Sequence, residues 1–551
     1  MPATPDAPAR GNRWWTLGIT AIATFMLMLD LTVVNVALPD LRTALHADFN
    51  GLQWVLDAYA LTLAAFLLTG GSLADRLGRK RVFMVGFALF TVASLASGAA
   101  GDILTLNLAR GAQGLGAAVL FSVSPALISQ EFHGRDRGTA FGVFGGVSGL
   151  AIAFGPLIGG ALTTGLGWRW IFLLNVPIGV VAMVLGQLRI RESREPGAHR
   201  VDWPGLAVFS AALTLLVLGF LRGEPEGWTS PLIVSLFSGA VVLLYLFVRL
   251  ERRAGAAAML DLSLFRIRTF NGISAATFLG NAAGMSSIFI EVSYMQNVLG
   301  SSPWQAGLRF LPLTLTLFVV AAVTGSLTVR VPPRLLVGTS LTLMAAGLAL
   351  VGLVDTHSTW TALLPSMIAT GAGMGMFNPP RASLSIAVVE PGRAGMAAGM
   401  GETFQQVGVA VGIAAFGALF QHRVVDGFQH TAVAGQLGPQ AHAAAEAVAA
   451  GAGNQVAQAA PGGIATAVAD AARSAFVDGM GQVFWVCAAT AAVGAVIAFL
   501  AIRRSDLHAT ALAGAETGAP SGAGAGVDGG VDAGADADAG DGRPSVRPAA
   551  V

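Results

Sequence analysis

Fourteen apolar runs dominate this chain, separated by short polar segments. Each run has about 18 to 25 residues, the length at which one α-helix crosses the roughly 30 Å hydrocarbon core of a bilayer. Because lipid offers backbone N–H and C=O groups no partner, a spanning segment must satisfy them within itself. The runs therefore predict an all-α, polytopic membrane protein with spans near residues 14–38, 52–73, 82–100, 103–125, 139–163, 170–188, 204–221, 231–249, 270–296, 305–328, 334–354, 360–380, 396–420 and 480–502.

Composition excludes several other classes of protein. Hydrophobic residues make up 54% of the chain and charged residues 11%, whereas soluble domains contain about 25% charged residues. A net charge of +1 gives no reason to expect a nucleic-acid partner. Lys80 is the only lysine and precedes Arg81, so no P-loop can bind ATP. Cys487 is the single cysteine, which excludes an internal disulfide. We expect no enzymatic activity, no metal site and no cofactor.

Basic residues are distributed unevenly between alternate loops. One set of loops contains little more than Arg42, Arg169 and Arg222. Positively charged loops stay on the cytoplasmic side, so we expect an even number of spans with both termini cytoplasmic. The residues assigned to the inner side are Arg76, Arg79, Lys80, Arg81, Arg135, Arg137, Arg189, Arg191, Arg194, Arg200, Arg249, Arg252, Arg253, Arg266, Arg268, Arg330, Arg334, Arg381 and Arg393.

The loop between the second and third runs reads Gly71-Ser72-Leu73-Ala74-Asp75-Arg76-Leu77-Gly78-Arg79-Lys80-Arg81. A basic hairpin alone would explain its arginines but not its Gly and Asp positions. The pattern G-x-L-A-D-R-x-G-R-[RK] resembles the signature loop between spans two and three of major facilitator superfamily transporters. This resemblance implies a gating role for Gly71, Asp75, Arg76, Gly78 and Arg79. It also implies that Asp75 meets the positive N-terminal end of a helix in the opposite half, such as the thirteenth span.

A weaker copy of this loop indicates an internal duplication. Residues 325–334 match it at Gly, Ser, Leu and Arg in the same spacing, but lack its Asp and its second Gly. Two related six-helix halves with a site between them are the architecture that the resemblance implies. We therefore expect a cytoplasmic N-terminus at 1–13, a six-helix bundle at 14–188, an inserted helix pair with basic cytoplasmic loops at 189–269 and a second bundle at 270–502.

Two further segments lie outside the spans. Alanine-rich sequence near 421–479 is interrupted by Gln, His, Asn, Gly and Pro, which predicts a large outer loop with room for a helical piece. Residues 503–551 are mostly Gly, Ala and Asp and cannot form a hydrophobic core. They predict a disordered cytoplasmic tail.

An aspartate lies within the first run. The segment from Leu29 to Pro39, Leu-Asp-Leu-Thr-Val-Val-Asn-Val-Ala-Leu-Pro, resembles the L-D-x-T-x-V-N-V-A-L-P signature of the fourteen-span drug:proton antiporter family. An ionised acid at that depth costs a few kcal/mol, which makes Asp30 a candidate proton carrier. The alternative is a structural Asp paired with a neighbour. Asp30 and Asn35 are also candidate substrate contacts.

An arginine lies within the fourth run. The segment from Leu106 to Ala118 is similar to the family's L-x-x-x-R-x-x-Q-G-x-G-A-A motif, which is associated with proton coupling. Arg110 keeps its charge, so it needs an anion or a wet cavity, and Asp30 is a reasonable partner. Alternatively, Arg110 tethers helices; the two roles are compatible.

Small residues and a proline mark the fifth run. Gly155-Pro156-Leu157-Ile158-Gly159-Gly160 resembles the G-P-x-x-G-G core of the antiporter signature, although Ala151 replaces the Gly expected four residues earlier. Pro removes a backbone hydrogen bond and Gly permits close helix approach. The resemblance implies a conformational role for Gly155, Pro156, Gly159 and Gly160, and export rather than uptake.

The thirteenth run departs from the commoner family pattern, with Glu402 and Gln405 where many relatives have Asn and Arg. Glu402 lies about eight residues, or ~12 Å, into the predicted helix. It is a candidate to carry a proton or to attract a cationic substrate. The alternative is a structural Glu that hydrogen-bonds to a facing helix.

Several polar residues lie near the predicted outer ends of spans. Asp57, Glu291 and Gln296 are candidate substrate contacts in an outer vestibule, and Glu291 could form an outer gate with Arg309. The alternative is that such shallow groups simply reach water.

Together these features predict a proton-coupled antiporter of the cytoplasmic (inner) membrane, acting as a monomer within the lipid bilayer. Its expected cargo is hydrophobic small molecules, cationic ones among them, such as drugs, dyes or antibiotics. One alternative is a dedicated exporter of a single endogenous metabolite. Another is a non-transporting sensor with the same fold, which would have no need of Asp30 and Arg110.

Overall fold

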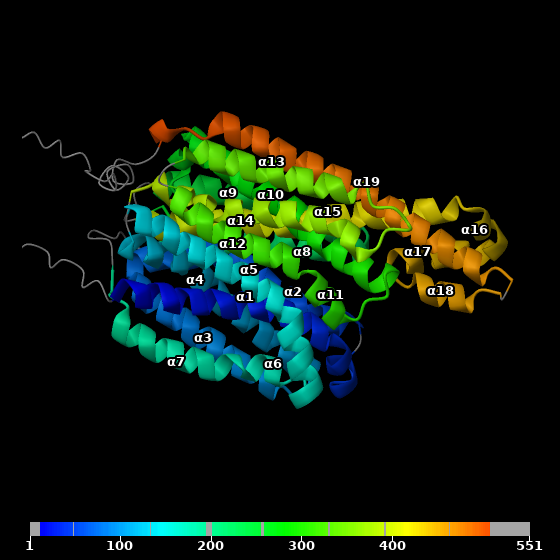
Figure 1. The fold of residues 1–551 in the computed structure, drawn as a ribbon. Coiled ribbons are helices and arrows are strands. Elements are labelled where there is room, and N and C mark those ends of the chain that lie inside the picture. The colour runs from blue at the N-terminus through cyan, green and yellow to red at the C-terminus, as the bar shows by residue number, and fades with distance from the viewer. Residues whose placement is uncertain are drawn as a thin grey trace, which may run out of the picture.

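The computed structural model describes residues 12–47, 49–132, 134–193, 201–254, 258–328, 331–390, 393–461 and 463–506. In these ranges the regular secondary structure is entirely helical (Figure 1). The predicted N-terminal segment 1–13 and tail 503–551 fall almost wholly outside the described residues.

The helices follow the order of the predicted spans. The first bundle comprises α1 (Asn12–Ala44), α2 (Phe49–Leu77), α3 (Arg79–Ala99), α4 (Ile103–Glu131), α5 (Gly134–Leu166), α6 (Trp170–Leu173) and α7 (Asn175–Arg189). The inserted pair is α8 (Trp203–Glu226) and α9 (Pro231–Ala254), followed by the short helix η2 (Leu262–Arg266). The second bundle comprises α10 (Arg268–Ser293), the π-helical turn η3 (Tyr294–Val298), α11 (Pro303–Arg309), α12 (Leu311–Leu327), α13 (Pro333–Val351), η4 (Trp360–Leu363), α14 (Leu364–Ala387), α15 (Ala394–Gln429) and α19 (Ala465–Ala501), which leads into η7 (Arg504–Asp506).

Eleven helices in the described ranges are long and apolar enough to cross a membrane. The other three predicted spans correspond to α5, α12 and α14. A single non-helical residue, Phe310, separates α12 from α11, and α14 contains Pro379 and Pro380. Helix α12 is apolar but has only 17 residues, and the apolar stretch found in α5 is Leu157–Leu166.

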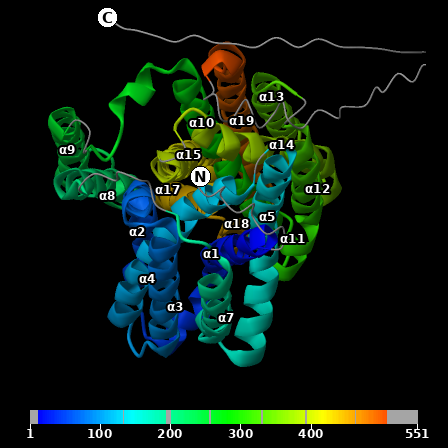
Figure 2. The same cartoon turned by 90° about the vertical axis from the view of Figure 1, so that its left-hand side faces the viewer.

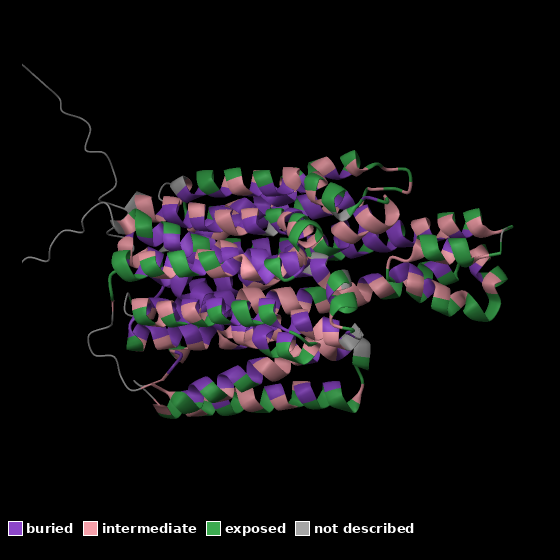
Figure 3. Cartoon of the chain, turned by 90° about the horizontal axis from the view of Figure 1, so that it is seen from below, coloured by how far each residue is buried: buried purple, intermediate pink, exposed green. Residues whose placement is uncertain are grey.

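The two bundles have separate cores. In the first, α1 packs on α5 and α4 packs on α2 and α3; in the second, α10 packs on α15 and α19, and α14 packs on α12 and α13. Buried apolar side chains form one cluster in each bundle, and exposed residues gather on the outer faces (Figure 3). Contacts between α5 and α12 and between α2 and α15 join the bundles.

The inserted pair lies outside both bundles. Helices α8 and α9 pack on each other, and α8 also packs on α2 and α15 (Figure 2). Large apolar side chains of α9, including Val241, Val242 and Tyr245, are exposed. Such a surface suits contact with lipid tails rather than water.

The predicted outer loop near 421–479 is mostly helical, which corrects the sequence expectation. Helix α15 continues to Gln429, α19 begins at Ala465, and between them lie α16 (Ala432–Leu437), η6 (Gly438–Gln440), α17 (Ala441–Ala449) and α18 (Gly453–Ala459). They project beyond the other helices (Figure 1). Alanine has the highest helix propensity, while Gly438 and Gly451, both at positive φ, lie where the short helices end.

Candidate transport site

Asp30 lies in a fully buried polar network inside the first bundle. Arg110 on α4 donates from Nη1 to Asp30 Oδ2, and the two side chains form an ion pair. Asp30 Oδ1 accepts hydrogen bonds from Gln113 Nε2 at 3.0 Å and from Asn175 Nδ2 at 3.4 Å. Both amides also donate to Ser94 Oγ, at 3.2 and 3.1 Å. The ionised carboxylate is therefore stabilised by one cation and two neutral donors.

Arg110 makes further contacts with two hydrogen-bond acceptors and two aromatic rings. Its Nε donates to the Val55 carbonyl at 3.0 Å and its Nη1 donates to Gln113 Oε1 at 2.9 Å. Its guanidinium carbon lies 4.3 Å from the centre of the Tyr59 ring and 5.7 Å from that of Phe172. Both stacked rings add cation–π attraction in a desolvated site. The arrangement is compatible with proton exchange at Asp30 and with helix tethering by Arg110, as the sequence left open.

Gln113, Asn175 and Ser94 were not singled out as site residues from the sequence. Gln113 follows Arg110 by three residues, which places both side chains on one face of a helix. That spacing could have identified it. Asn175 and Ser94 come from α7 and α3, and no local pattern links them to Asp30.

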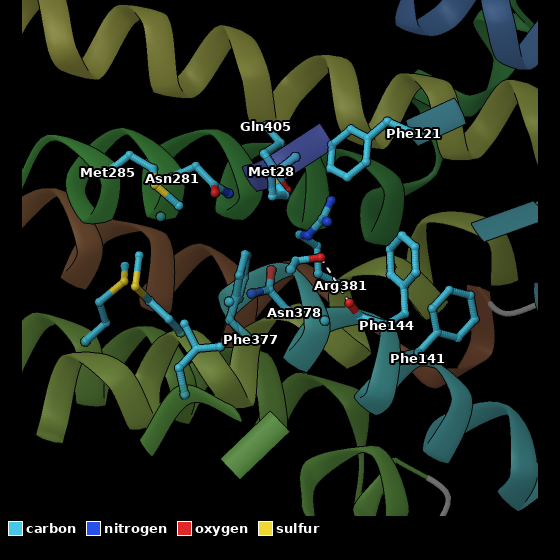
Figure 4. A pocket seen from close by; sticks show the side chains of 18 residues that line it. Met28, Phe121, Phe141, Phe144, Asn281, Met285, Phe377, Asn378, Arg381 and Gln405 are labelled. Carbon is cyan, nitrogen blue, oxygen red and sulfur yellow. Dashed lines mark hydrogen bonds between the residues drawn. The ribbon is translucent and has the colours of Figure 1, made fainter. Parts of the chain in front are cut away.

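A separate cavity of about 80 Å³ lies between the two bundles (Figure 4). Its walls are mainly aromatic and thioether side chains from both bundles, with a few polar groups. Sites for drug-sized ligands occupy ~300–1,000 Å³, so in this conformation the cavity is smaller than such a ligand needs. The side chains that give it its character are Phe121, Phe141, Phe144, Phe377, Met28, Met285, Met344, Met374, Ser148, Asn281, Asn378, Gln405 and Arg381.

Asp30 was expected to contact substrate but does not line this cavity. Met28, two residues earlier on α1, does line it. Two residues turn a helix by about 200°, so Asp30 points away from the cavity and into the first bundle. The candidate proton site and the candidate substrate cavity are thus adjacent but distinct.

Glu402 has a partner that the sequence analysis placed elsewhere. Arg381 was assigned to an inner loop, yet it lies within α14 and is 4% exposed. Its Nη2 donates to Glu402 Oε1 at 3.1 Å, and both side chains are buried. The assignment was wrong because α14 continues to Ala387, seven residues beyond the predicted end of that span.

The outer-gate pair suggested by the sequence is not formed among the described residues in this conformation. Glu291 is 1% exposed, and Arg309 donates instead to Ser301 Oγ. Within the described residues no ion pair joins Glu291 to Arg309. Asp57 is 7% exposed, so both acids are covered by protein rather than open to water.

The remaining predicted contacts do not meet at one place. Gln296 lies in η3 and is partly buried, away from the residues that line the central cavity. The side chains of Asn35 and Pro156 lie outside what the structure describes. Gly155 packs against α1, where an added Cβ would overlap Thr32 Oγ1, whereas Gly160 has nothing within 4 Å of an added Cβ.

Asp75 lies at the contact between the two bundles. Its Oδ1 accepts from the backbone N–H of Gly395 at 3.0 Å, and its Oδ2 accepts from that of Met396 at 2.8 Å. Both N–H groups lie in the first turn of α15, the thirteenth span, where backbone donors have no partner within the helix. Arg79 also donates to Asp75 Oδ1, from Nη2 at 2.9 Å. The carboxylate therefore crosses from one half to the positive end of a helix in the other.

Further polar contacts hold the loops around Asp75. Arg76 donates to the Ala258 carbonyl at 2.6 Å, and Arg393 pairs with Asp261 at 2.7 Å. Partial burial tends to raise the pKa of Asp261, but hydrogen bonds from Ser263 and Arg393 outweigh it and hold that pKa below its usual value. Gly78 has φ 109°, and an added Cβ would come within 2.7 Å of Glu192 Oε1. A glycine is thus favoured here by the backbone conformation, because side chains rarely adopt this φ.

Two glycines bring the halves together without intervening side chains. An added Cβ at Gly71 would overlap the Gly395 carbonyl, and one at Gly325 would overlap the Gly138 carbonyl. Gly71 and Gly325 are the matching positions of the duplicated loop. Each faces the opposite bundle, so the duplication is visible in the contacts as well as in the sequence.

We expect Gly325→Ala to open this contact, because its methyl group cannot fit against the α5 backbone. The readout is labelling of Ser148→Cys, which lines the cavity, in a Cys487→Ala background that removes the natural thiol. In inverted vesicles, a membrane-impermeant thiol reagent should react with the thiol introduced by Ser148→Cys several-fold faster when Gly325→Ala is present than when Gly325 is kept. Gly417→Ala is the matched control, since an added Cβ there meets nothing within 4 Å. Equal labelling of both variants would show that the contact does not control access.

Comparison with known proteins decides the family. Residues 20–267 and 272–424 match the model of the Major Facilitator Superfamily. The chain belongs to this superfamily and is a transporter rather than an enzyme. The fold agrees: the proton:xylose symporter XylE aligns over 90% of this chain and 96% of its own with a TM-score of 0.58 at 12% identity. A bacterial homologue of the human lysosomal transporter Spinster aligns over 91% and 99%, with a TM-score of 0.55 at 18% identity.

The more similar relatives are named for drug or antibiotic resistance. The multidrug resistance protein Stp of Mycobacterium tuberculosis is 33% identical over 73% of this chain and 75% of its own. The puromycin resistance protein pur8 of Streptomyces alboniger is 38% identical over 73% and 81%. The tetracenomycin C resistance and export protein of Streptomyces glaucescens is 32% identical over 90% and 93%.

Proposed function

We propose that this transporter exports hydrophobic small molecules, of the drug, dye or antibiotic class, in exchange for protons. The Asp30–Arg110–Gln113 network carries the proton part of the proposal. It places one ionisable carboxylate, 2% exposed, beside a fixed cation in the bundle that also supplies one wall of the central cavity. The names of the relatives support the drug-export part.

The cavity suits such a cargo. Four phenylalanines and four methionines offer apolar and polarisable surface, and methionine adapts to ligands of different shape. The cargo would enter when the contacts at Asp75 and at Gly325 separate. Protonation of Asp30 would remove its charge and weaken its hold on Arg110, which couples the network to movement of α1 and α4.

The location and assembly are part of the same proposal. We infer that the chain lies in the cytoplasmic (inner) membrane as a monomer. In the structure α1 begins and α19 ends at the same end of the bundle (Figure 1). Together with the arginine-rich loops this arrangement supports both termini being cytoplasmic.

Inverted membrane vesicles test the proposal. We expect uptake of hydrophobic compounds into these vesicles when the lumen is acidic, and loss of that uptake when the pH gradient is collapsed. Empty vesicles are the control. Uptake that persists without a proton gradient would contradict proton exchange, and no uptake of any compound would contradict drug export.

A dedicated exporter of one endogenous metabolite is the second candidate. The relatives include the tetracenomycin C protein and a probable actinorhodin transporter of Streptomyces coelicolor, 34% identical over 76% of this chain and 75% of its own. The same vesicle assay separates the two, because a multidrug exporter accepts many unrelated compounds and a dedicated one accepts few.

A further inference from the structure

Arg381 is the one charged side chain among the described residues that line the central cavity. In Figure 4 it lies between Asn281 and Met285 on one side and the rings of Phe121 and Phe144 on the other. Its side chain is only 5% exposed. One nitrogen, Nη2, donates to Glu402, while Nε and Nη1 have no hydrogen-bond partner among the described residues. Buried donors of a guanidinium that lack acceptors are costly, so the site is built to receive one.

Glu402 engages Arg381 through Oε1 alone and does not line the cavity, and its Oε2 is buried without a partner among the described residues. Glu402 is absent from the lining, whereas Gln405, three residues further along α15, is present. Its negative charge is already balanced by Arg381, as that of Asp30 is balanced by Arg110. The ion pair is neutral overall, but its positive partner, Arg381, is the one that faces the cavity. A cationic cargo would therefore bind unfavourably there.

The neighbours of Arg381 define the rest of the ligand. Phenylalanine rings and methionine thioethers favour a planar aromatic body. Gln405 Oε1, buried and without a partner among the described residues, can accept one hydrogen bond from the ligand.

We propose that Arg381 binds an anionic oxygen of the cargo, so that the transported molecule is an aromatic weak acid bearing a phenolate or carboxylate. Glu402 holds the guanidinium in place while the cavity is empty. The inference rests on the proposed export function and specifies its substrate class. It reverses the preference for cations that the acidic Glu402 suggested in the sequence.

Two fluorescent probes with the same ring and opposite charge test it: anthracene-9-carboxylate and (9-anthracenylmethyl)trimethylammonium. Each probe is titrated against the full chain in lipid nanodiscs, and binding is measured by the fluorescence of the probe. Arg381→Gln should weaken carboxylate binding about 10- to 100-fold, the range for a lost charge-assisted hydrogen bond, and should not weaken cation binding. Glu402→Gln should strengthen carboxylate binding several-fold, because it releases the guanidinium. Arg423→Gln, which removes an exposed cation from α15, should change neither.

Two results would overturn the inference. Loss of cation binding in Glu402→Gln with unchanged carboxylate binding would make Glu402 a cation site. Equal weakening of both probes in Arg381→Gln would make Arg381 a structural residue. The double variant Arg381→Gln/Glu402→Gln leaves no unpaired buried charge. If Arg381→Gln alone does not fold, the double variant tests the inference in its place. It is expected to bind the carboxylate probe no more tightly than the cationic probe.

The binding and vesicle assays also separate this inference from the proposed function. Charge-dependent binding without transport of either probe would contradict export and leave the Arg381 site standing. Transport of both probes with no dependence on Arg381 would leave export standing and contradict the site.

Discussion

Arg110→Ala should reduce gradient-driven efflux by about 100-fold or more. Removing one partner of a buried ion pair typically costs about 3–5 kcal/mol, and each 1.4 kcal/mol is a factor of ten. The ionised form of Asp30 would be left in the first bundle with only the amides of Gln113 and Asn175 as donors. It could then no longer complete a cycle of proton binding and release. The measurement is proton-driven uptake into inverted vesicles, with the amount of inserted protein determined in parallel.

A double-mutant cycle shows whether the pair works as a unit. Asp30→Asn should lose as much activity as Arg110→Ala, and the double variant should lose little more than the worse single one, because interacting sites are non-additive. Arg169→Ala is the control. The guanidinium carbon of Arg169 also lies 4.3 Å from the centre of an aromatic ring, that of Trp168, but Arg169 has no acidic partner within 4.0 Å among the described residues. Losses that add up in the double variant would mean that Asp30 and Arg110 act separately.

Asp75→Asn should favour the conformation that is open at the Asp75 end and slow turnover about 10-fold or more. The carboxylate accepts two backbone N–H groups at the start of α15. An amide presents only one acceptor oxygen, and a hydrogen bond to a charged group contributes about 1.5–3 kcal/mol. Such a difference is enough to reverse a two-state population. Labelling of Ser148→Cys in the Cys487→Ala background, together with turnover in vesicles, measures both effects.

Asp102→Asn is the matched control for Asp75→Asn. Asp102 also accepts a backbone N–H, from Thr105 at 2.9 Å, but it caps its own helix, α4. Asn is about as good an N-cap as Asp, so the control should label and transport like the parent. If Asp75→Asn also behaves like the parent, the contact between the halves does not hold this end closed.

Much of the fold could be predicted from the sequence. Span order follows from hydropathy, because a membrane helix must be predominantly apolar. The motif residues Asp30, Arg110 and Asp75 were identifiable because polar groups within apolar runs are rare and costly. The pairing of Asp30 with Arg110 could be anticipated, because each buried charge needs an opposite charge and few charged residues lie within the apolar runs.

Other features depended on residues distant in the sequence. The end of α14 was misplaced because Arg381 was read as a loop residue, when Glu402 on another helix allows it to be buried. The helices of the outer segment were underestimated because packing against α15 and α19 compensates for interruptions in their sequence.

The sequence by itself therefore determined that the chain forms membrane-spanning helices, in which order, and which buried charges need partners. These properties follow from the solvation of each segment, which depends on local composition. Only the tertiary structure decided that Arg381 pairs with Glu402, that Arg381 rather than Glu402 faces the cavity, and that Gly325 meets Gly138. Such choices depend on the rotation and close approach of helices that are far apart in the chain, and one sequence does not encode them in any local pattern.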